Sequence, residues 1–241
     1  MSKCHSTRFD QIKPQLATMK SSQIKNLFRF LPQILITLVT LFWLLTACNP
    51  PLDYLQVSGG VLFQDDFSHP IANWKQANSP QAASEYRDDS YILSIQQPYL
   101  RAVSHPGLNF SNVQIEVDAH PLSGSAQNLY GIICRYQNDK NYYALMISSD
   151  SYYGIFANVE GKFGLIGVEL MSVSNIIHPM PDLNHLSAKC SGDQLSLAVN
   201  GVPLTTQRDN HFYQGDIGLL AGTLEEASIE VQFDNLCVIK P

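Results

Sequence analysis

Basic residues are scarce in this sequence beyond residue 47. Residues 1–47 hold six of the 15 Lys and Arg and one of the 21 Asp and Glu, which leaves nine basic and 20 acidic residues and a net charge of −11. Nucleic-acid binding requires clustered Lys and Arg that contact phosphates, and anionic lipid surfaces attract basic segments. The composition therefore predicts no nucleic-acid partner and no electrostatic attachment to a membrane.

The common local motifs of catalytic and metal sites are also missing. The sequence contains no G-x-S-x-G, no P-loop and no dinucleotide-binding fingerprint, and its His residues show neither H-x-H nor H-E-x-x-H spacing. We therefore expect no cofactor and no metal site. Asp65 and Asp66 offer oxygen atoms that suit Ca²⁺, but Asp side chains at a strand end more often accept hydrogen bonds from turn N–H groups, and we prefer this second interpretation.

No apolar run is long enough to cross a bilayer comfortably, which takes about 20 residues. The longest, Ile34 to Leu45, has 12 residues and comes after Lys20, Lys25 and Arg29. A short apolar run behind positive charges, ending in small residues, is typical of a secretory signal. The sequence therefore predicts export of the chain beyond this run.

The tetrad LTAC at 45–48 resembles the cleavage box of bacterial lipoproteins. The resemblance implies cleavage before Cys48, lipidation of its thiol, and a membrane partner held through acyl chains. We expect a leader helix in a signal peptide over 1–47, with Met19 as its true start, and a tether over 48–60. The alternative is an uncleaved anchor helix that ends at the prolines after Cys48. Either interpretation places the domain in the bacterial envelope, outside the cytoplasmic membrane.

Residues 61–241 carry the alternating pattern of β-strands. The segment from Asn128 to Gly161 contains three runs rich in Tyr and Ile, separated by the polar turns QNDKN and SSDS, which predicts a three-stranded meander. Alternation places Tyr130, Ile132, Cys134 and Tyr136 on one face, and Gly131, Ile133 and Arg135 on the other. Asn200-Gly201 is a strong two-residue hairpin turn. Further strands are expected at 61–67, 91–95, 100–104, 113–118, 163–170, 185–190, 194–199, 202–206, 216–221 and 229–239.

This pattern predicts an all-β fold, a two-sheet antiparallel sandwich, because the strands are short, turns recur every 8–12 residues and no amphipathic helix is evident. The segments FQDDFSHPIANW, YGIICRYQNDKNYYALMISSDSYYGIF, LSAKCSGDQLSLAVNGVPL, GDIGLLAGT and VQFDNL resemble the concanavalin A-like lectin/glucanase superfamily, and in particular the laminin-G-like jelly rolls of bacterial lipoproteins. The resemblance covers nearly all of residues 62–239. It implies a fold and not an activity, since this superfamily includes lectins, glucanases and adhesion modules.

Three cysteines, Cys134, Cys190 and Cys237, remain in the exported domain, where disulfides persist. Three thiols allow three pairings, and the residues alone do not choose among them. The resemblance implies the pair Cys134–Cys190, because related domains carry Cys after a G-x-I and before a short G-D turn. Cys237 would then be a buried thiol in the last strand.

Two clusters are candidates for chemistry. Glu116 and Asp118 share a strand face, as the acids of jelly-roll glucanases do, but His and Pro occupy the positions of the third acid of that motif. They are therefore weak candidates for catalysis, and a solvent-facing polar strand face is the preferred explanation. Arg135, Tyr143 and Tyr153 are the candidates for ligand binding, because aromatic rings and Arg suit sugars. They belong to an aromatic cluster of Tyr130, Tyr136, Tyr142, Tyr143, Tyr152, Tyr153, Phe156 and Phe163, about half of which alternation assigns to the core.

These observations favour a lipid-anchored protein with a non-catalytic jelly roll that binds a glycan or another envelope component. A glycoside hydrolase-like enzyme and a purely structural interaction module are the alternatives. The side chains that line the concave face decide among these three functions. Acids facing the concave groove with a third carboxylate favour the enzyme. Aromatics and amides on that face favour the lectin. A face filled by large side chains favours the interaction module.

Overall fold

The computed structural model describes residues 59–226 and 228–241. The expected signal peptide, Cys48 and all but the end of the tether lie outside this part of the chain. Within it, no helix is long and apolar enough to cross a membrane. The described residues form two antiparallel sheets, which confirms the predicted all-β sandwich.

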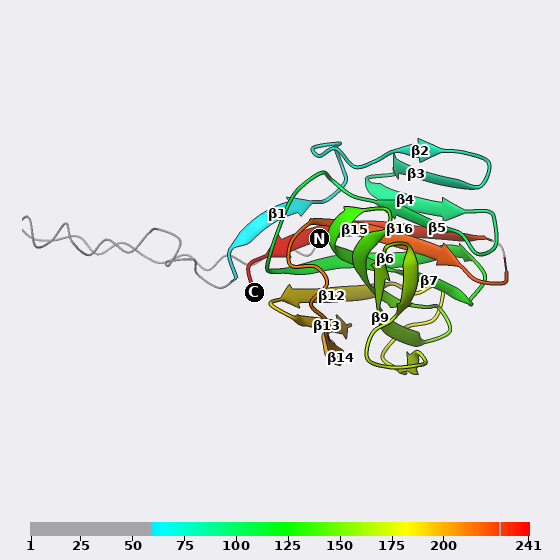
Figure 1. Ribbon diagram of the computed structural model, residues 1–241. Coiled ribbons are helices and arrows are strands. Elements are labelled where there is room, and N and C mark those ends of the chain that lie inside the picture. Colours follow the sequence, from blue (N-terminus) through cyan, green and yellow to red (C-terminus); the bar gives the residue numbers. More distant parts are fainter. Residues whose placement is uncertain (1–58, 227) are drawn as a thin grey trace, which may run out of the picture. The chain divides into compact units, whose positions relative to one another are not determined.

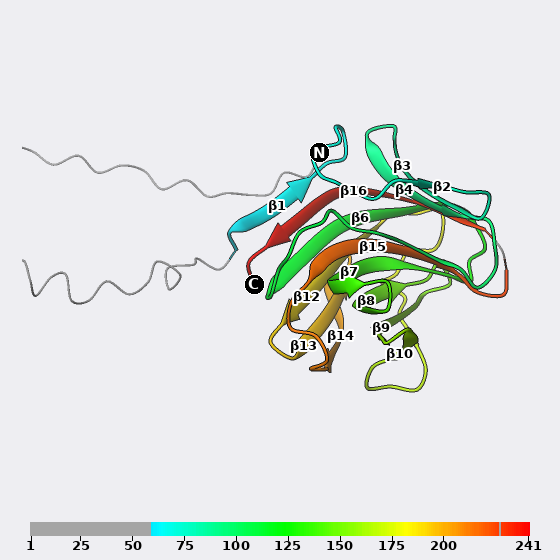
Figure 2. The ribbon, with the colours of Figure 1, turned by 45° about the horizontal axis from the view of Figure 1, so that its top comes forward.

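The larger sheet has nine strands in the order β14-β13-β12-β6-β16-β4-β3-β2, with β1 paired to β16 (Figures 1 and 2). Its strands are β1 (Val61–Asp65), β2 (Ala77–Asn78), β3 (Ala82–Arg87), β4 (Ser90–Ile95), β6 (Val113–Gly124), β12 (Asn184–Ser191), β13 (Gln194–Val199), β14 (Val202–Arg208) and β16 (Ile229–Ile239).

The smaller sheet has seven strands in the order β10-β9-β8-β7-β15-β5, with β11 paired to β9. Its strands are β5 (Arg101–Ser104), β7 (Asn128–Asn138), β8 (Asn141–Ile147), β9 (Tyr152–Val159), β10 (Lys162–Leu165), β11 (Ser172–Val173) and β15 (Asp216–Thr223). The expected meander is β7, β8 and β9, and each of these strands pairs with the next.

The main core lies between the two sheets. Strand β6 contributes Val113, Ile115, Val117 and Ala119, each at most 1% exposed, as the alternation predicted. The disulfide Cys134–Cys190 joins β7 of the smaller sheet to β12 of the larger one, which confirms the pairing that the resemblance implied. Cys237 is buried and is not part of this bond.

One end of the core is an aromatic cluster built on the first turn of the domain, FQDDF. The buried Asp65 accepts hydrogen bonds from the backbone N–H of Phe67 (2.8 Å) and from the indole Nε1–H of Trp74 (2.9 Å). Phe67 and Trp74 pack edge to face with ring centroids 5.3 Å apart. Asp66 accepts from the N–H and hydroxyl of Ser68. Both carboxylates therefore serve the turn, as the preferred interpretation held.

Two strand predictions were incomplete. The expected strand 163–170 ends at Leu165, because Ile166 turns inward and is 7% exposed while Gly167 has a φ of 71°. Strand β3 was missed altogether. Its sequence AASEYR has weak β-propensity, and it is held in the sheet by pairing with β4 on one side and β2 on the other.

A β-bulge in β7 overturns the predicted alternation beyond Cys134. Arg135 has a φ of 54°, and the β7–β15 register shifts between the pairs Tyr136–Asp216 and Ile133–Gly218, so that β7 has one residue more than its partner. Tyr136 consequently packs on the same side of the sheet as Ile133 rather than Cys134. Gly215 lies against the bulge, where a Cβ atom would come 2.5 Å from the carbonyl carbon of Arg135.

Candidate functional site

Two of the predicted ligand-binding residues, Arg135 and Tyr143, lie in the protein interior. Arg135 is 1% exposed and donates from Nη1 to the carbonyl oxygen of Phe212 (2.8 Å), while Tyr143 is fully buried. The Tyr143 hydroxyl donates to Asp209 and accepts from the backbone N–H of Phe212 (3.0 Å). Burial lowers the pKa of Arg135 and raises that of Tyr143. The prediction that they contact ligand is wrong, because both side chains instead fasten the loop before β15 to the core.

Tyr153, the third predicted ligand-binding residue, is half-buried and packs against the main core. Its hydroxyl lies 3.5 Å from the carbonyl oxygen of Leu204 on β14, at the far edge of the other sheet. The structure therefore does not bring the three predicted residues together into one groove.

The acidic pair lies on the outer face of the larger sheet. Glu116 and Asp118 are half-buried and alternate with the core residues of β6. Asp118 accepts from Asn235 (2.9 Å) and forms an ion pair with His185, whose Nδ1 lies 2.7 Å from Oδ1. The hydrogen bond from His185 lowers the pKa of Asp118, and the same bond raises the pKa of His185. Asp118 is thus held ionised in a structural network, on the sheet opposite the aromatic face.

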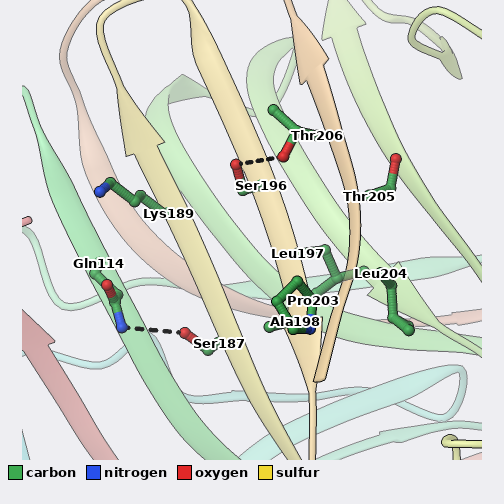
Figure 3. A pocket seen from close by; sticks show the side chains of 10 residues that line it. All are labelled: Gln114, Ser187, Lys189, Ser196, Leu197, Ala198, Pro203, Leu204, Thr205 and Thr206. Carbon is green, nitrogen blue, oxygen red and sulfur yellow. Dashed lines mark hydrogen bonds between the residues drawn. The ribbon is translucent and has the colours of Figure 1, made fainter. Parts of the chain in front are cut away.

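A shallow hollow of about 410 Å³ also lies on the outer face of the larger sheet, over β6, β12, β13 and β14 (Figure 3). Its polar side chains already have hydrogen-bond partners: Gln114 donates to Glu116 (2.8 Å) and Ser187 (3.3 Å), and the hydroxyls of Ser196 and Thr206 lie 2.9 Å apart. It is lined by no aromatic ring among the described residues, so it offers little to the apolar face of a sugar.

The outer face of the smaller sheet holds a second set of aromatic residues. Tyr136 stacks on His105 (centroids 4.3 Å apart) and on Tyr142 (5.9 Å), and Phe156 stacks on Phe163 (5.0 Å). Together with aliphatic neighbours they form a second apolar cluster outside the main core. The prediction that the aromatic cluster divides between core and surface face is therefore confirmed, although Tyr136 changes sides because of the bulge.

The outer face of the smaller sheet is strongly curved, and large side chains fill it. Strands β5 and β10 are at opposite edges of the sheet order, yet the guanidinium carbon of Arg101 on β5 lies 4.2 Å from the ring centroid of Phe163 on β10. Such a contact across the whole sheet requires its edges to curl toward each other. Tyr142 is 2% exposed beneath them. Large side chains therefore occupy the middle of the concave face.

A second hollow opens beside this filled face, and we call it the rim pocket. Its volume is about 430 Å³, and it lies over edge strand β5, between the β2–β3 hairpin and the concave face. Lys75, Tyr99, Arg101, Asp139 and Tyr142 contribute its charged and aromatic lining. Tyr99 is 73% exposed, so its ring is available to a partner from solvent. Volumes of a few hundred Å³ suit small-molecule ligands.

A network of polar side chains is bonded to Asp139, one of the residues that line the rim pocket. Asn158 is 2% exposed and donates from Nδ2 to the carbonyl oxygen of Asp139 (2.9 Å), while its Oδ1 is buried with no hydrogen-bond partner in the described structure. Asp139 also accepts from the hydroxyl of Tyr136 (2.6 Å). Burial raises the pKa of Tyr142, and hydrogen bonds from Arg101 and Asn158 offset part of that effect. Buried polar atoms without partners are rare in proteins; Asn158 Oδ1 is one of them, but Asn158 itself does not line the rim pocket.

The described part of the chain contains no group of three or more His, Cys, Asp or Glu side chains positioned to share an ion. A second His–Asp pair, His105–Asp216 (2.9 Å), is fixed at the sheet edge by the N–H of Gly107, which donates to the same carboxylate oxygen at 2.7 Å. This pair orients the ring that Tyr136 stacks on.

Comparison with known proteins identifies the fold. Neither a protein-family model nor a curated protein sequence matches this chain. Solved structures do match. One is the carbohydrate-binding module CBM66 from Bacillus subtilis, with a TM-score of 0.56, 15% identity, and coverage of 70% of this chain and 96% of that one. Another is a Bacillus subtilis protein with a galectin-like fold (TM-score 0.58, 11% identity, 77% and 98% coverage).

A third similar structure is a GH16 protein from a Bacteroides ovatus mixed-linkage glucan locus, in complex with an oligosaccharide product (TM-score 0.52, 10% identity, 74% and 100% coverage). This chain has the concanavalin A-like sandwich fold. At such low identities the likeness shows the fold alone.

The rim pocket was not predicted from the sequence. Its lining comes from a loop before β2, from β5 and from the β7–β8 turn, which are far apart along the chain. Only Tyr142 belonged to the aromatic cluster singled out above. Arg101 and Asp139 carry no local motif, and no pattern in the sequence relates them.

Proposed function

We propose that this protein is a non-catalytic carbohydrate-binding protein and that the rim pocket is its glycan site. The observation that supports this best is the joint presence of an exposed aromatic residue, Tyr99, and three charged side chains, Lys75, Arg101 and Asp139, around one pocket of about 430 Å³. Sugars combine apolar C–H faces with hydroxyl groups, so a site for them needs both kinds of surface. The solved carbohydrate-binding module and the GH16 protein with the same fold add support.

The size of the pocket suggests what part of a glycan it holds. A pocket at the lower end of the usual range for small ligands accommodates about one or two sugar rings. The filled concave face next to it leaves no room for a longer chain. We therefore infer that the site recognises the end of a glycan or a branch, not the middle of a linear polysaccharide.

Catalysis is less well supported than binding. Glycoside hydrolysis normally uses a pair of carboxylates on either side of the scissile bond. Within the described residues the rim pocket is lined by a single carboxylate, that of Asp139. Glu116 and Asp118 lie on the outer face of the larger sheet, and Asp118 forms an ion pair with His185.

We also propose that the domain is exported and anchored through a lipid on Cys48. This part of the proposal rests on the charged segment, the short apolar run and the LTAC tetrad of the sequence. Metabolic labelling with a clickable palmitate analogue in a bacterial host tests it. Label should be incorporated into the wild-type chain and absent from Cys48→Ser. Equal labelling of both chains would contradict it.

Glycan binding can be tested by screening the full chain, in detergent micelles, on an array of neutral and charged glycans. Arg101→Ala removes a charged hydrogen-bond donor from the rim pocket and should weaken binding about tenfold or more. The matched control is Lys189→Ala, which removes a cation that lines the shallow hollow on the opposite sheet. This control should bind as the wild type does.

Two outcomes would overturn the assignment of the site. Binding that Lys189→Ala abolishes and Arg101→Ala leaves intact would move the site to the larger sheet. No binding to any glycan would favour the interaction module, the alternative that the filled concave face supports. Thermal unfolding of both variants verifies that a loss of binding does not reflect a loss of fold.

A further inference from the structure

We infer that the rim pocket selects glycans that carry a negatively charged group, with a carboxylate-bearing sugar as the expected best ligand. This inference rests on the proposed function. It comes from the distribution of charge over the domain, from the geometry of Arg101, and from the carboxylate acceptor, Asp139, in the pocket lining.

This domain has few Lys and Arg residues, and most of them form ion pairs, are buried, or lie away from the rim pocket. Residues 59–241 contain nine Lys and Arg against 19 Asp and Glu. Arg87 pairs with Glu230 (2.6 Å), Arg208 pairs with Asp193 (2.8 Å), and Arg135 is buried. Arg101 and Lys75, in contrast, both line the rim pocket, and neither forms an ion pair with a described carboxylate. Two unpaired cations at one pocket of an acidic protein are a local attraction for an anion.

The position of the Arg101 guanidinium also suits the binding of an anion. Its guanidinium lies over the ring of Phe163, with 4.2 Å between the guanidinium carbon and the ring centroid. Stacking restrains the planar group, and its five N–H donors leave several for a ligand besides the hydrogen bond to Tyr142. A carboxylate matches the guanidinium with two parallel hydrogen bonds. Lys75 adds a flexible second charge from the segment that leads into the β2–β3 hairpin.

The remaining lining of the pocket suits the hydroxyl groups of a ligand better than a small free anion. Asp139 lines the pocket, and its carboxylate would repel a small, dense anion such as free phosphate. The same carboxylate can accept hydrogen bonds from the hydroxyls of a sugar, as it does from the hydroxyl of Tyr136. A sugar that bears one acidic group and several hydroxyls satisfies both walls at once. Inorganic phosphate satisfies only the cationic wall.

The test compares matched glycans on the full chain by isothermal titration. The probes are the acidic glycans that bind most tightly on the array, each beside its carboxyl-reduced or desulfated form, and inorganic phosphate alone. We expect the acidic form to bind at least tenfold more tightly than its neutral counterpart, and phosphate to bind more weakly than any acidic sugar. Affinity for the acidic form should fall as NaCl is raised, because screening weakens exposed charge pairs.

Variants assign the effect to the two cations. Arg101→Gln and Lys75→Gln should each reduce the preference for the acidic form and flatten its salt dependence, whereas Arg101→Lys should retain more of it than Arg101→Gln. Lys189→Gln removes the same charge elsewhere and should change neither quantity. Carboxylated, sulfated and phosphorylated glycans form separate arms, and tighter binding of a sulfated or phosphorylated glycan would overturn the expectation of a carboxylate.

The failure of this inference differs from the failure of the proposed function. If neutral glycans bind at the rim pocket as tightly as their acidic forms, charge selection is wrong while carbohydrate binding stands. If phosphate alone binds as well as any acidic sugar, the pocket is a simple anion site and the sugar assignment is wrong. If no glycan of any charge binds, both proposals are overturned.

Discussion

Reduction of the disulfide between Cys134 and Cys190 should cost this domain a large part of its stability. The bond closes a loop with a sequence separation of 56 residues and ties β7 in one sheet to β12 in the other. In the chain-entropy account, a loop of this length restricts the unfolded chain by an amount worth about 4 kcal/mol at room temperature. For a domain of this size, that difference corresponds to a fall of about 10 °C in the unfolding temperature.

The measurement is urea unfolding followed by tryptophan and tyrosine fluorescence, with and without reductant. Because the amino-acid sequence is the same in both samples, side-chain packing changes little, and the comparison reports mainly the cross-link. The double variant C134A/C190A is the control, and reductant should not alter its midpoint. The reduced protein should also show a steeper dependence on urea, since its unfolded chain is more expanded.

A difference below about 1 kcal/mol between oxidised and reduced protein would refute this reasoning. It would mean either that the reduced unfolded chain keeps the two strands close together, or that the sheets pack well enough without the bond. A reductant effect of similar size in C134A/C190A would show that the effect does not arise from this cross-link.

Two further perturbations concern the buried polar contacts. Trp74→Phe keeps most of the ring packing but leaves the buried carboxylate of Asp65 without its indole donor, so urea unfolding should show a loss of about 2 kcal/mol, whereas a loss below about 0.5 kcal/mol would contradict the role of this bond. His185→Gln should destabilise the protein more at about pH 5 than at about pH 8, because the hydrogen bond between His185 and Asp118 raises the pKa of the former and lowers that of the latter. The pair therefore stabilises the fold fully only at pH values between the ordinary pKa values of Asp, 3.8, and His, 6.5. Its contribution is lost as the pH rises through the raised pKa of His185 in the folded protein. Equal losses of stability at both pH values would contradict this reasoning.

The binding experiments depend on choosing residues that ligand can reach. Tyr143 and Arg135 looked suitable from the sequence, but substituting them would damage the core and would mimic a loss of binding. Arg101 and Lys75 avoid this difficulty because both are exposed at the rim pocket. Their variants therefore report on recognition and not on folding.

The amino-acid sequence by itself determined the fold class and most of the strands. Alternation in β6 is strict, and every second residue from Val113 to Ala119 is buried as expected, because a strand with one face against the core cannot shift by one residue without exposing that whole face. The Asn200-Gly201 turn likewise lies between β13 and β14. Local chemistry decides such features, since each depends on residues that are neighbours in the chain.

Tertiary structure alone decided which face of β7 and β8 each aromatic residue joins. Both faces of the smaller sheet are largely apolar, so alternation marks two faces without saying which one meets the core. The bulge at Arg135 then exchanges the faces of the residues beyond it, and it shows as a register shift in the pairing with β15, a strand far along the chain. A period of two in the sequence contains no trace of that extra residue.

The rim pocket is the clearest product of tertiary structure. Curvature of the smaller sheet brings Arg101 at one edge against Phe163 at the other, and pairing of the poorly predicted β3 builds the wall on the remaining side. Sheet curvature arises from twist and bulges summed over all strands. No local segment specifies it, so the sequence shows that the chain has a jelly-roll sandwich, and only the folded arrangement shows where a ligand fits.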